Sequence, residues 1–138
     1  MNKHGRRVVH YPERCVNCFT CEVACKQEHS LPVGIHWIKV LRHGPYLKDG
    51  RLFMDYSVRQ CQHCDEPKCL ATCLEKAIYK RPDGIVLIKE ELCTGCQLCQ
   101  EACSFDAITF DEKHKVVGKC IMCVHLLDQN MEPSCVKH

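Results

Sequence analysis

CQHCDEPKCLATC, residues 61–73, and CTGCQLCQEAC, residues 93–103, together hold eight of the fifteen cysteines in this 138-residue chain. The gaps between cysteines are two, four and three residues in the first run, and two, two and three in the second. In paired runs of this kind, three cysteines wrap one iron–sulfur cluster and the fourth ligates the neighbouring cluster. The two runs therefore predict a pair of 4Fe–4S clusters whose ligands interleave.

Two further groups of cysteines stand outside this central pair. The run that starts at Cys15 has gaps of two, two and three residues, and the run that starts at Cys120 has gaps of two and eleven. A further cysteine three residues on in the last run would fall one position beyond His138. We predict no catalytic residue and fifteen cluster ligands: Cys15, Cys18, Cys21, Cys25, Cys61, Cys64, Cys69, Cys73, Cys93, Cys96, Cys99, Cys103, Cys120, Cys123 and Cys135.

Composition excludes several classes of protein. A net charge of +2 does not favour nucleic acid or anionic lipid as a partner. The longest apolar stretch, residues 85–88, is far shorter than the roughly 18 residues of a membrane span. Arg6 and Arg7 resemble the start of a twin-arginine signal, but His10 and Pro12 interrupt the apolar segment that should follow. The sequence thus predicts a soluble, cytoplasmic protein.

The segments between the cysteine runs predict small hairpins. Strands at 77–80 and 85–88 flank the turn Arg81-Pro82-Asp83-Gly84, in which proline presets φ and glycine supplies a positive φ. Strands at 107–110 and 116–117 repeat this layout. The repeat predicts an α+β, ferredoxin-like fold of two pseudo-twofold-related two-cluster modules with short β-hairpins and helices.

We expect one polyferredoxin domain over residues 1–138. Its inner module covers 59–118, and its outer module combines 8–29 with 119–138. The insertion at 30–58 contains two β-prone segments, 35–41 and 52–58, and turn signals at Gly44-Pro45 and Asp49-Gly50. It predicts a hairpin that covers one side of the cluster core. Trp37 is expected to be a packing residue, with the shielding of a cluster from water as the alternative.

Other interpretations of the cysteines fit less well. A disulfide scaffold conflicts with the odd number of cysteines and with their arrangement in closely spaced runs. Structural zinc sites use two CxxC pairs rather than four-cysteine runs. His63 lies within a CxxC pair, but four cysteines already complete that run, so we do not expect it to be a ligand. A catalytic iron–sulfur enzyme needs an open iron position, which only the incomplete fourth set of ligands could offer.

The order of the gaps, 2-2-3, 2-4-3, 2-2-3 and 2-11, resembles that of the four-cluster electron-transfer subunits of the dimethyl sulfoxide reductase type. The chain is also similar to the small iron–sulfur subunits that accompany molybdenum and tungsten oxidoreductases. The resemblance extends over most of the chain, in the stretches CVNCFTCEVACKQEHSLP (15–32), RQCQHCDEPKCLATC (59–73), AIYKRPDGIV (77–86), CTGCQLCQEAC (93–103) and KCIMC…PSC (119–135).

This resemblance implies how the ligands are distributed. One 4Fe–4S cluster takes Cys61, Cys64, Cys69 and Cys103; its partner takes Cys93, Cys96, Cys99 and Cys73; a third takes Cys120, Cys123, Cys135 and Cys25. A fourth cluster takes Cys15, Cys18 and Cys21, with its last ligand at or beyond the C-terminus. The chain departs from the family where proline usually follows the last cysteine of the second and third runs, because Leu74 and Ser104 stand there.

The resemblance further implies a function and its partners. The chain is expected to be a non-catalytic, hetero-oligomeric subunit that relays single electrons between a catalytic subunit containing tungsten or molybdenum and a soluble donor or acceptor. An aldehyde oxidoreductase or benzoyl-coenzyme-A reductase complex is the expected type. The alternative is a polyferredoxin that shuttles electrons without a permanent partner.

Overall fold

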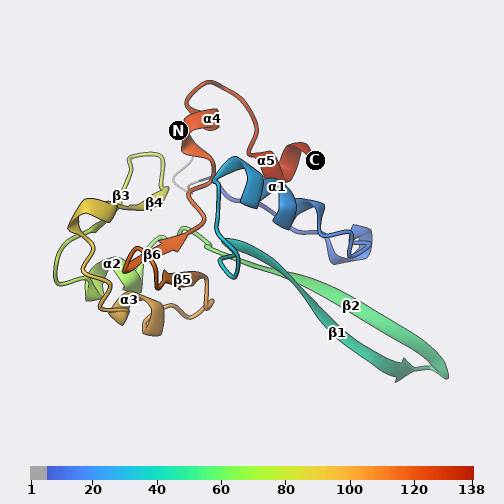
Figure 1. Ribbon diagram of the computed structural model, residues 1–138. Helices are drawn as coiled ribbons and strands as arrows, with labels where there is room; N and C mark the ends of the chain where they lie inside the picture. The colour runs from blue at the N-terminus through green and yellow to red at the C-terminus, as the bar shows by residue number, and fades with distance from the viewer. Residues whose placement is uncertain (1–5) are drawn as a thin grey trace.

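The computed structural model describes residues 6–138, which form short helices and three separate two-stranded antiparallel sheets (Figure 1). The helices are η1 (Pro12–Arg14), α1 (Thr20–Glu28), α2 (Lys68–Thr72), η2 (Glu90–Leu92), α3 (Leu98–Glu101), α4 (Val124–Leu127) and α5 (Ser134–Lys137). The strands are β1 (Ile38–Lys48), β2 (Arg51–Gln60), β3 (Ile78–Lys80), β4 (Val86–Ile88), β5 (Ile108–Asp111) and β6 (Val116–Lys119). Small hairpins and short helices joined by cysteine-bearing loops fit the expected α+β, ferredoxin-like class.

The two small hairpins form where the sequence predicts them. In β3–β4, Ile78 pairs with Ile88, and the intervening turn is closed by a hydrogen bond from the Arg81 N–H to the Ile85 carbonyl. In β5–β6, Ile108 pairs with Lys119. The turn chemistry of residues 81–84 therefore gave a correct prediction of a local structure.

Strand β4 lies between two apolar clusters because its side chains alternate in direction. Val86 belongs to a cluster with Ile78, Ile108 and Val117, against which several cysteines pack. Leu87 belongs to a second cluster, which includes Ile85, Met122 and residues of α4. One short strand thus connects the part of the molecule that holds the central cysteine runs with the part that holds the last run.

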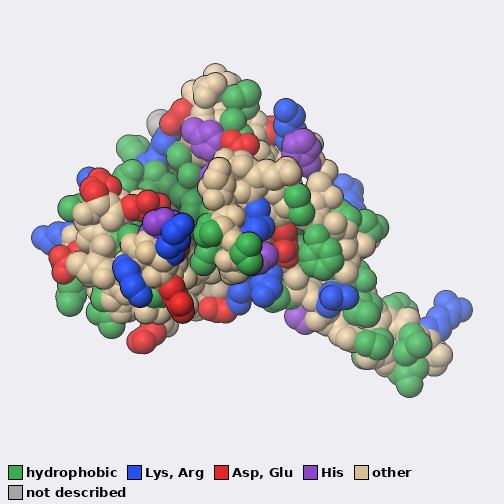
Figure 2. All heavy atoms as spheres, viewed as in Figure 1, with side chains coloured by type: hydrophobic (Ala, Val, Ile, Leu, Met, Phe, Trp, Pro, Cys, Tyr) green, Lys and Arg blue, Asp and Glu red, His purple; other side chains and the backbone are tan. Residues whose placement is uncertain are grey.

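The hairpin β1–β2 is longer than expected, and the prediction that it covers the cluster core is wrong for its outer half. At its base, Ile38, Val40 and Gln60 are buried, but from residue 42 to residue 55 every side chain in the strands is exposed. Figure 1 shows this outer half projecting away from the rest of the molecule, and hydrophobic side chains lie along it in Figure 2. Within residues 6–138 the side chains of this outer half remain exposed, so the pattern of β-prone residues predicted the strands but not their direction.

Only one of the two turn signals within this insertion forms the turn of the hairpin. Asp49-Gly50 joins the two strands, as a hairpin turn does. Gly44-Pro45 instead lies within β1, where the register with β2 shifts between His43 and Tyr46. Proline cannot donate a ladder hydrogen bond, which accounts for the irregularity at this point.

The outer part of the molecule is built from chain segments that are distant in sequence. Helix α1 packs against α5, and the carboxylate of Glu28 accepts hydrogen bonds from Ser134 on α5 and from His125 on α4. Glu22 on α1 accepts a hydrogen bond from the backbone of Val40 in β1. Within residues 6–138, the helices all lack the length and apolar character needed to cross a membrane.

Candidate iron–sulfur sites

Four predicted ligands surround one cavity between α2, α3 and the two small hairpins. The cavity also borders Val86, Phe105, Ile108 and Lys119. We call this group site I: Cys61, Cys64, Cys69 and Cys103. Three of its cysteines come from the run at 61–73, and the fourth comes from the run at 93–103.

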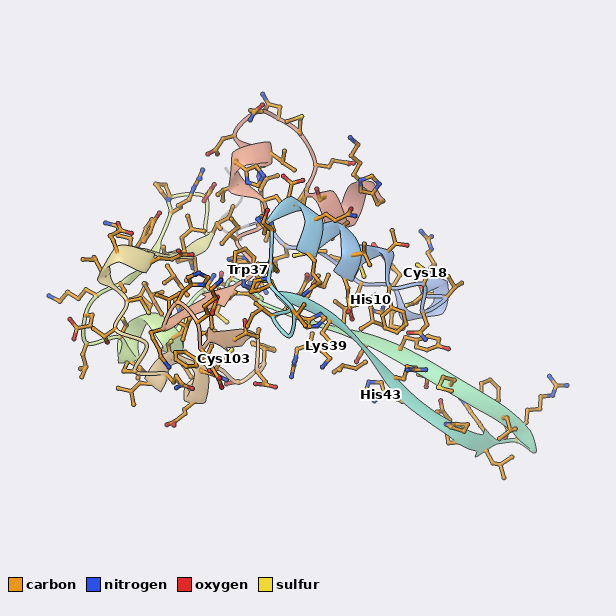
Figure 3. The ribbon with its side chains drawn as sticks, in the orientation of Figure 1. His10, Cys18, Trp37, Lys39, His43 and Cys103 are labelled. Carbon is orange, nitrogen blue, oxygen red and sulfur yellow. The ribbon has the colours of Figure 1, made fainter. Side chains whose placement is uncertain are left out.

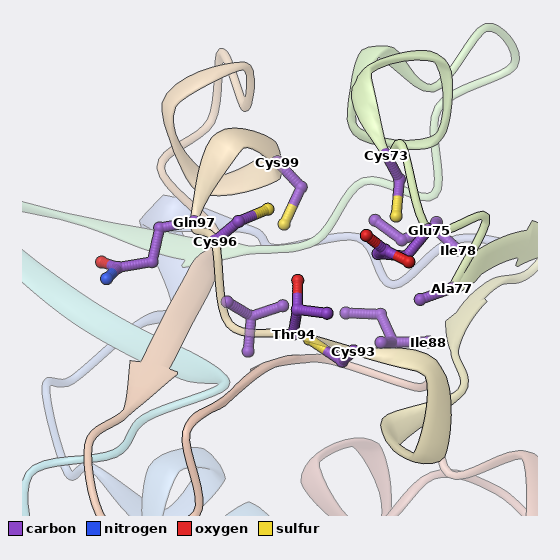
Figure 4. A pocket seen from close by; sticks show the side chains of 11 residues that line it. Cys73, Glu75, Ala77, Ile78, Ile88, Cys93, Thr94, Cys96, Gln97 and Cys99 are labelled. Atoms are coloured by element: carbon purple, nitrogen blue, oxygen red, sulfur yellow. The ribbon is translucent and has the colours of Figure 1, made fainter.

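A second cavity gathers the complementary four cysteines (Figure 4). Figure 4 shows their sulfur atoms facing a shared space that is closed by Ile78, Ile88 and Thr94. We call this group site II: Cys73, Cys93, Cys96 and Cys99. The structure therefore places the last cysteine of each central run beside the three cysteines of the other run.

The cysteine loops share an unusual backbone conformation. In the first CxxC pair of each run the residue before the second cysteine has a positive φ: Asn17, His63, Gly95 and Met122. This conformation turns the chain sharply and directs backbone N–H groups inward, as in the N–H groups of His63 and Met122, which lie 3.4 Å and 3.3 Å from the sulfurs of Cys61 and Cys120. Such donors stabilise the negative charge of thiolate sulfur.

Gly95 is the one position of this set where a side chain has no room. Its φ is +70°, and a Cβ atom there would overlap the carbonyl oxygen of Lys115. The loop of site II and the β5–β6 turn can approach each other only because residue 95 is glycine.

Short helices position one cysteine of each run. Cys21, Cys69, Cys99 and Cys135 are each the second residue of a helix, in α1, α2, α3 and α5 respectively. The loop ends and the helix begins at the same place, so the side chain of this cysteine turns back towards its own loop. The spacing of the cysteines thus corresponds to one repeated loop–helix unit.

A third group of thiols lies where α1 meets α5 and the loop before α4. Burial raises the pKa of Cys25, and the neighbouring thiols of Cys120, Cys135, Cys123 and Cys21 raise it further. Burial likewise raises the pKa of Cys120 to about 12 and that of Cys135 to about 11. We call the four of these thiols that the family resemblance groups together site III: Cys25, Cys120, Cys123 and Cys135.

The remaining three cysteines form the loop that leads into α1. We call this group site IV: Cys15, Cys18 and Cys21. Cys18 is exposed, and a hydrogen bond from Thr20 lowers the pKa of its thiol. Figure 3 shows Cys18 on the opposite side of the molecule from Cys103 of site I.

The four groups follow one another in a definite order. Besides burial, the thiol of Cys69 in site I contributes to raising the pKa of Cys99 in site II to about 11. The thiol of Cys61 in site I likewise contributes to raising the pKa of Cys120 in site III. The thiol of Cys21 in site IV contributes to raising the pKa of Cys135 in site III. Neighbouring sites are therefore II and I, I and III, and III and IV.

Three residues that the sequence analysis did not assign to a site contact these groups. Nε2 of His29 lies 3.2 Å from the sulfur of Cys123, and the buried Lys119 borders the cavity of site I. His63 is buried and its Nδ1 accepts a hydrogen bond from the Val86 N–H, while burial and the charge of Lys119 lower its pKa to about 3. Nothing in the cysteine spacing indicated these contacts.

Trp37, expected to pack, lies over Gly118 and beside the ring of His29.

The donor set fits iron–sulfur clusters. Crowded, buried thiols with raised pKa values resist deprotonation, and iron supplies the positive charge that stabilises them as thiolates. Among residues 6–138, no three His, Cys, Asp or Glu side chains converge as the ligands of a single ion do. Sites I and II instead place four sulfurs around a space, which suits a multi-iron cofactor.

Comparison with known proteins agrees with this chemistry. Residues 52–138 match the family model of the 4Fe-4S dicluster domain. The sequence is 35% identical to the B component of polysulfide reductase from Wolinella succinogenes, over 97% of this chain and 70% of that protein. It is 34% identical to the putative iron-sulfur B component of dimethyl sulfoxide reductase from Halobacterium salinarum and to the B component of tetrathionate reductase from Salmonella typhimurium, in each case over 90% of this chain.

The chain spans 58% and 50% of the lengths of the last two relatives. The family match covers the central runs and the last run, and the similarity to the relatives extends over most of the remaining sequence. The cofactor is accordingly the 4Fe–4S cluster. This protein belongs to the 4Fe–4S dicluster family, among the iron–sulfur subunits of reductases of the dimethyl sulfoxide, polysulfide and tetrathionate type.

Proposed function

We propose that this protein relays single electrons through a series of 4Fe–4S clusters, between a catalytic reductase subunit and a redox partner, and does no substrate chemistry itself. One observation carries the proposal. Of the fifteen cysteines, all of which lie in the described part of the chain, only Cys18 and Cys96 are exposed. They belong to sites IV and II, the two ends of the series II–I–III–IV, so electrons can enter at one end and leave at the other.

In this proposal the cysteines of sites I, II and III each ligate one cluster. Site IV contributes Cys15, Cys18 and Cys21 to a fourth cluster, whose last ligand lies outside the fifteen cysteines. The inner module, 59–118, and the outer module, 8–29 with 119–138, form two two-cluster units related by a pseudo-twofold axis. The cavities of sites I and II, each lined by three cysteines of one central run and one of the other, support the inner unit.

The exchange of ligands between runs is tested with Cys73→Ser and Cys103→Ser. Each variant is purified without oxygen and its iron content and electron paramagnetic resonance spectrum are measured. Cys73→Ser is expected to remove or alter only the cluster of site II, although Cys73 belongs to the run of site I. Cys103→Ser is expected to affect only site I. If each substitution instead perturbs the cluster of its own run, the ligand sets are wrong.

The series of sites is tested by removing a cluster from its interior. In the fully reduced protein, adjacent paramagnetic clusters broaden each other's resonance signals. Cys64→Ser, in site I, is expected to abolish the coupling of the site II cluster to the site I cluster, so that the signal of site II, whose only neighbour in the series is site I, narrows while its cluster remains. Cys18→Ser, at an end, is the matched control and should leave that coupling unchanged. Coupling that survives in Cys64→Ser would contradict the order.

The partner is proposed from the relatives, whose names describe them as components of reductases. We propose a cytoplasmic complex with a catalytic subunit that contains molybdenum or tungsten, together with a soluble electron donor or acceptor. Native purification followed by metal analysis tests this proposal. About 16 iron atoms per chain, four for each of four clusters, with molybdenum or tungsten in the same fraction, is the expected result. A protein that elutes alone at 15.9 kDa would indicate a free shuttle instead.

A further inference from the structure

Lys119 is one of the most deeply buried side chains in the described part of the chain, with 1% of its surface exposed. It is the last residue of β6, directly before Cys120. Its Nζ donates hydrogen bonds to the carbonyl oxygens of Val86 and Cys120, the latter at 3.1 Å. Both acceptors are neutral, and no carboxylate among residues 6–138 lies within ion-pair distance of this ammonium group.

A buried lysine without a carboxylate needs another source of negative charge, because moving an ammonium group out of water is costly. Two such sources flank Lys119. Its side chain lines the cavity of site I, and its backbone continues into Cys120 of site III. A 4Fe–4S cluster with four thiolate ligands is an anion, and it becomes more negative by one charge when it is reduced.

We propose that Lys119 is a fixed counter-ion shared by the clusters of sites I and III, and that it raises their reduction potentials above those of sites II and IV. This inference rests on the proposed electron relay. A positive charge in a dry environment stabilises the added electron strongly, since the low local dielectric screens it little. The net charge around a cluster is one of the factors that set its potential.

The position of Lys119 gives the effect a consequence for the relay. Sites I and III are the two interior sites of the series, and both lie next to this charge. Electrons that enter from either end would therefore reside first on the interior pair. In a reductive titration of the natural protein, the clusters of sites I and III are reduced before those of the exposed ends.

Lys80, beside a cysteine loop of site I, offers a matched control. Nζ of Lys80 also donates to two carbonyl oxygens of a cysteine loop, those of Cys64 at 3.0 Å and Asp65 at 2.8 Å. Its side chain is 27% exposed, however, and it lies 3.9 Å from the carboxylate of Asp65. Water and this carboxylate screen its charge, so Lys80→Met tests the loss of a loop hydrogen bond without the loss of a buried, unpaired charge.

The experiment compares Lys119→Met, which is similar in length but uncharged, with Lys80→Met and the natural protein. Each is titrated with dithionite and mediators, the resonance signals are followed, and iron is counted. Signals are assigned to sites with the cysteine variants described above. Lys119→Met is expected to shift the reduction equilibrium of sites I and III towards the oxidised form by at least about tenfold, which is 59 mV for one electron. Sites II and IV, and all sites in Lys80→Met, should shift much less.

Several results would overturn the inference. One is that the reduction potentials stay unchanged in an iron-replete Lys119→Met protein. Another is that this substitution shifts the potentials of all four clusters equally. A third is that Lys80→Met shifts the potentials of sites I and III as much as Lys119→Met does. If Lys119→Met fails to incorporate iron, Lys119→Gln and Lys119→Arg separate charge from packing. Assembly with arginine but not with glutamine supports the counter-ion, and failure of both assigns the side chain to packing. The cysteine variants test the ligand sets of the proposed electron relay, and the Lys119 variants test the counter-ion. Failure of one proposal can therefore be distinguished from failure of the other.

Discussion

Nε2 of His29 lies 3.2 Å from the sulfur of Cys123, although 94 residues separate the two in sequence. The imidazole ring is held in place by Trp37, whose ring centroid is 4.9 Å away. Burial lowers the pKa of His29, and the nearby His125 lowers it further. A thiolate sulfur only accepts hydrogen bonds, and the nitrogen that faces Cys123 therefore carries the hydrogen when this cysteine ligates iron.

Substitution of His29 by leucine is expected to lower the reduction potential of the cluster in site III. The hydrogen bond to the sulfur stabilises the reduced cluster, which is more negative, and its loss favours the oxidised form. A redox titration followed by electron paramagnetic resonance measures the shift. His43→Leu is the control, because His43 is exposed on the projecting hairpin and bonds Ser57 rather than a cysteine. An unchanged potential in His29→Leu would show that this contact does not tune the cluster.

The link between α1 and α5 should make site III sensitive to acid. Hydrogen bonds from His125 and Ser134 lower the pKa of Glu28 below its ordinary value of 4.5. A carboxylate with a depressed folded-state pKa stabilises the fold above its unfolded pKa, and this contribution disappears as the pH falls through the lower, folded value. Compared with Glu28→Gln, the natural protein should lose its cluster from site III more slowly at pH 5 to 7, with the difference shrinking below 4.5.

Cluster absorbance, recorded over time at each pH, measures this difference. Glu132→Gln is the control, since Glu132 is exposed and lies outside the α1–α5 contact. It should behave as the natural protein does at every pH. A constant difference between the natural protein and Glu28→Gln down to pH 3 would contradict the assignment to Glu28.

Gly95→Ala is expected to destabilise site II by more than a positive φ alone explains. Alanine at φ +70° costs about 1–2 kcal/mol, and the contact of its Cβ with the Lys115 carbonyl should add about 1–3 kcal/mol. Gly50→Ala is the matched control, because its φ is +74° but nothing lies within 4 Å of the added Cβ. The rate of cluster loss in denaturant compares the two. Equal rates would mean that the β5–β6 turn moves aside at little cost.

The sequence predicted the cysteine loops and small hairpins well because their causes are local. A CxxC pair needs only a few residues to turn around a cluster, and Pro82-Asp83-Gly84 contains its own turn chemistry. The grouping of Cys73 with the run at 93–103 is different, since it joins distant segments. The ligand exchange typical of paired cysteine runs anticipated it, and the family resemblance assigned the individual ligands.

Other features depend on tertiary contacts that leave no pattern in the sequence. Lys119 looks like an ordinary surface lysine until β4 covers it, and His29 belongs to a polar helix end that the last cysteine run happens to cover. The outer half of β1–β2 has the residues of a strand that packs on a core, yet it projects. Strand propensity reports a fit to a pleated surface and does not say which element lies against it.

Removal of the clusters is expected to unfold most of the protein. The two apolar clusters are small, and one of them is completed by cysteines of sites I and II, including Cys69, Cys99 and Cys103. Without iron these sulfurs lose the bonds that hold four separate loops together, and the free energy of metal binding is lost from the free energy of folding. Far-ultraviolet circular dichroism after anaerobic chelation should show a large loss of ordered structure and no cooperative thermal transition. A native-like spectrum with a cooperative melt would show that the apolar clusters suffice, and the role of the 4Fe–4S clusters in folding would then be minor.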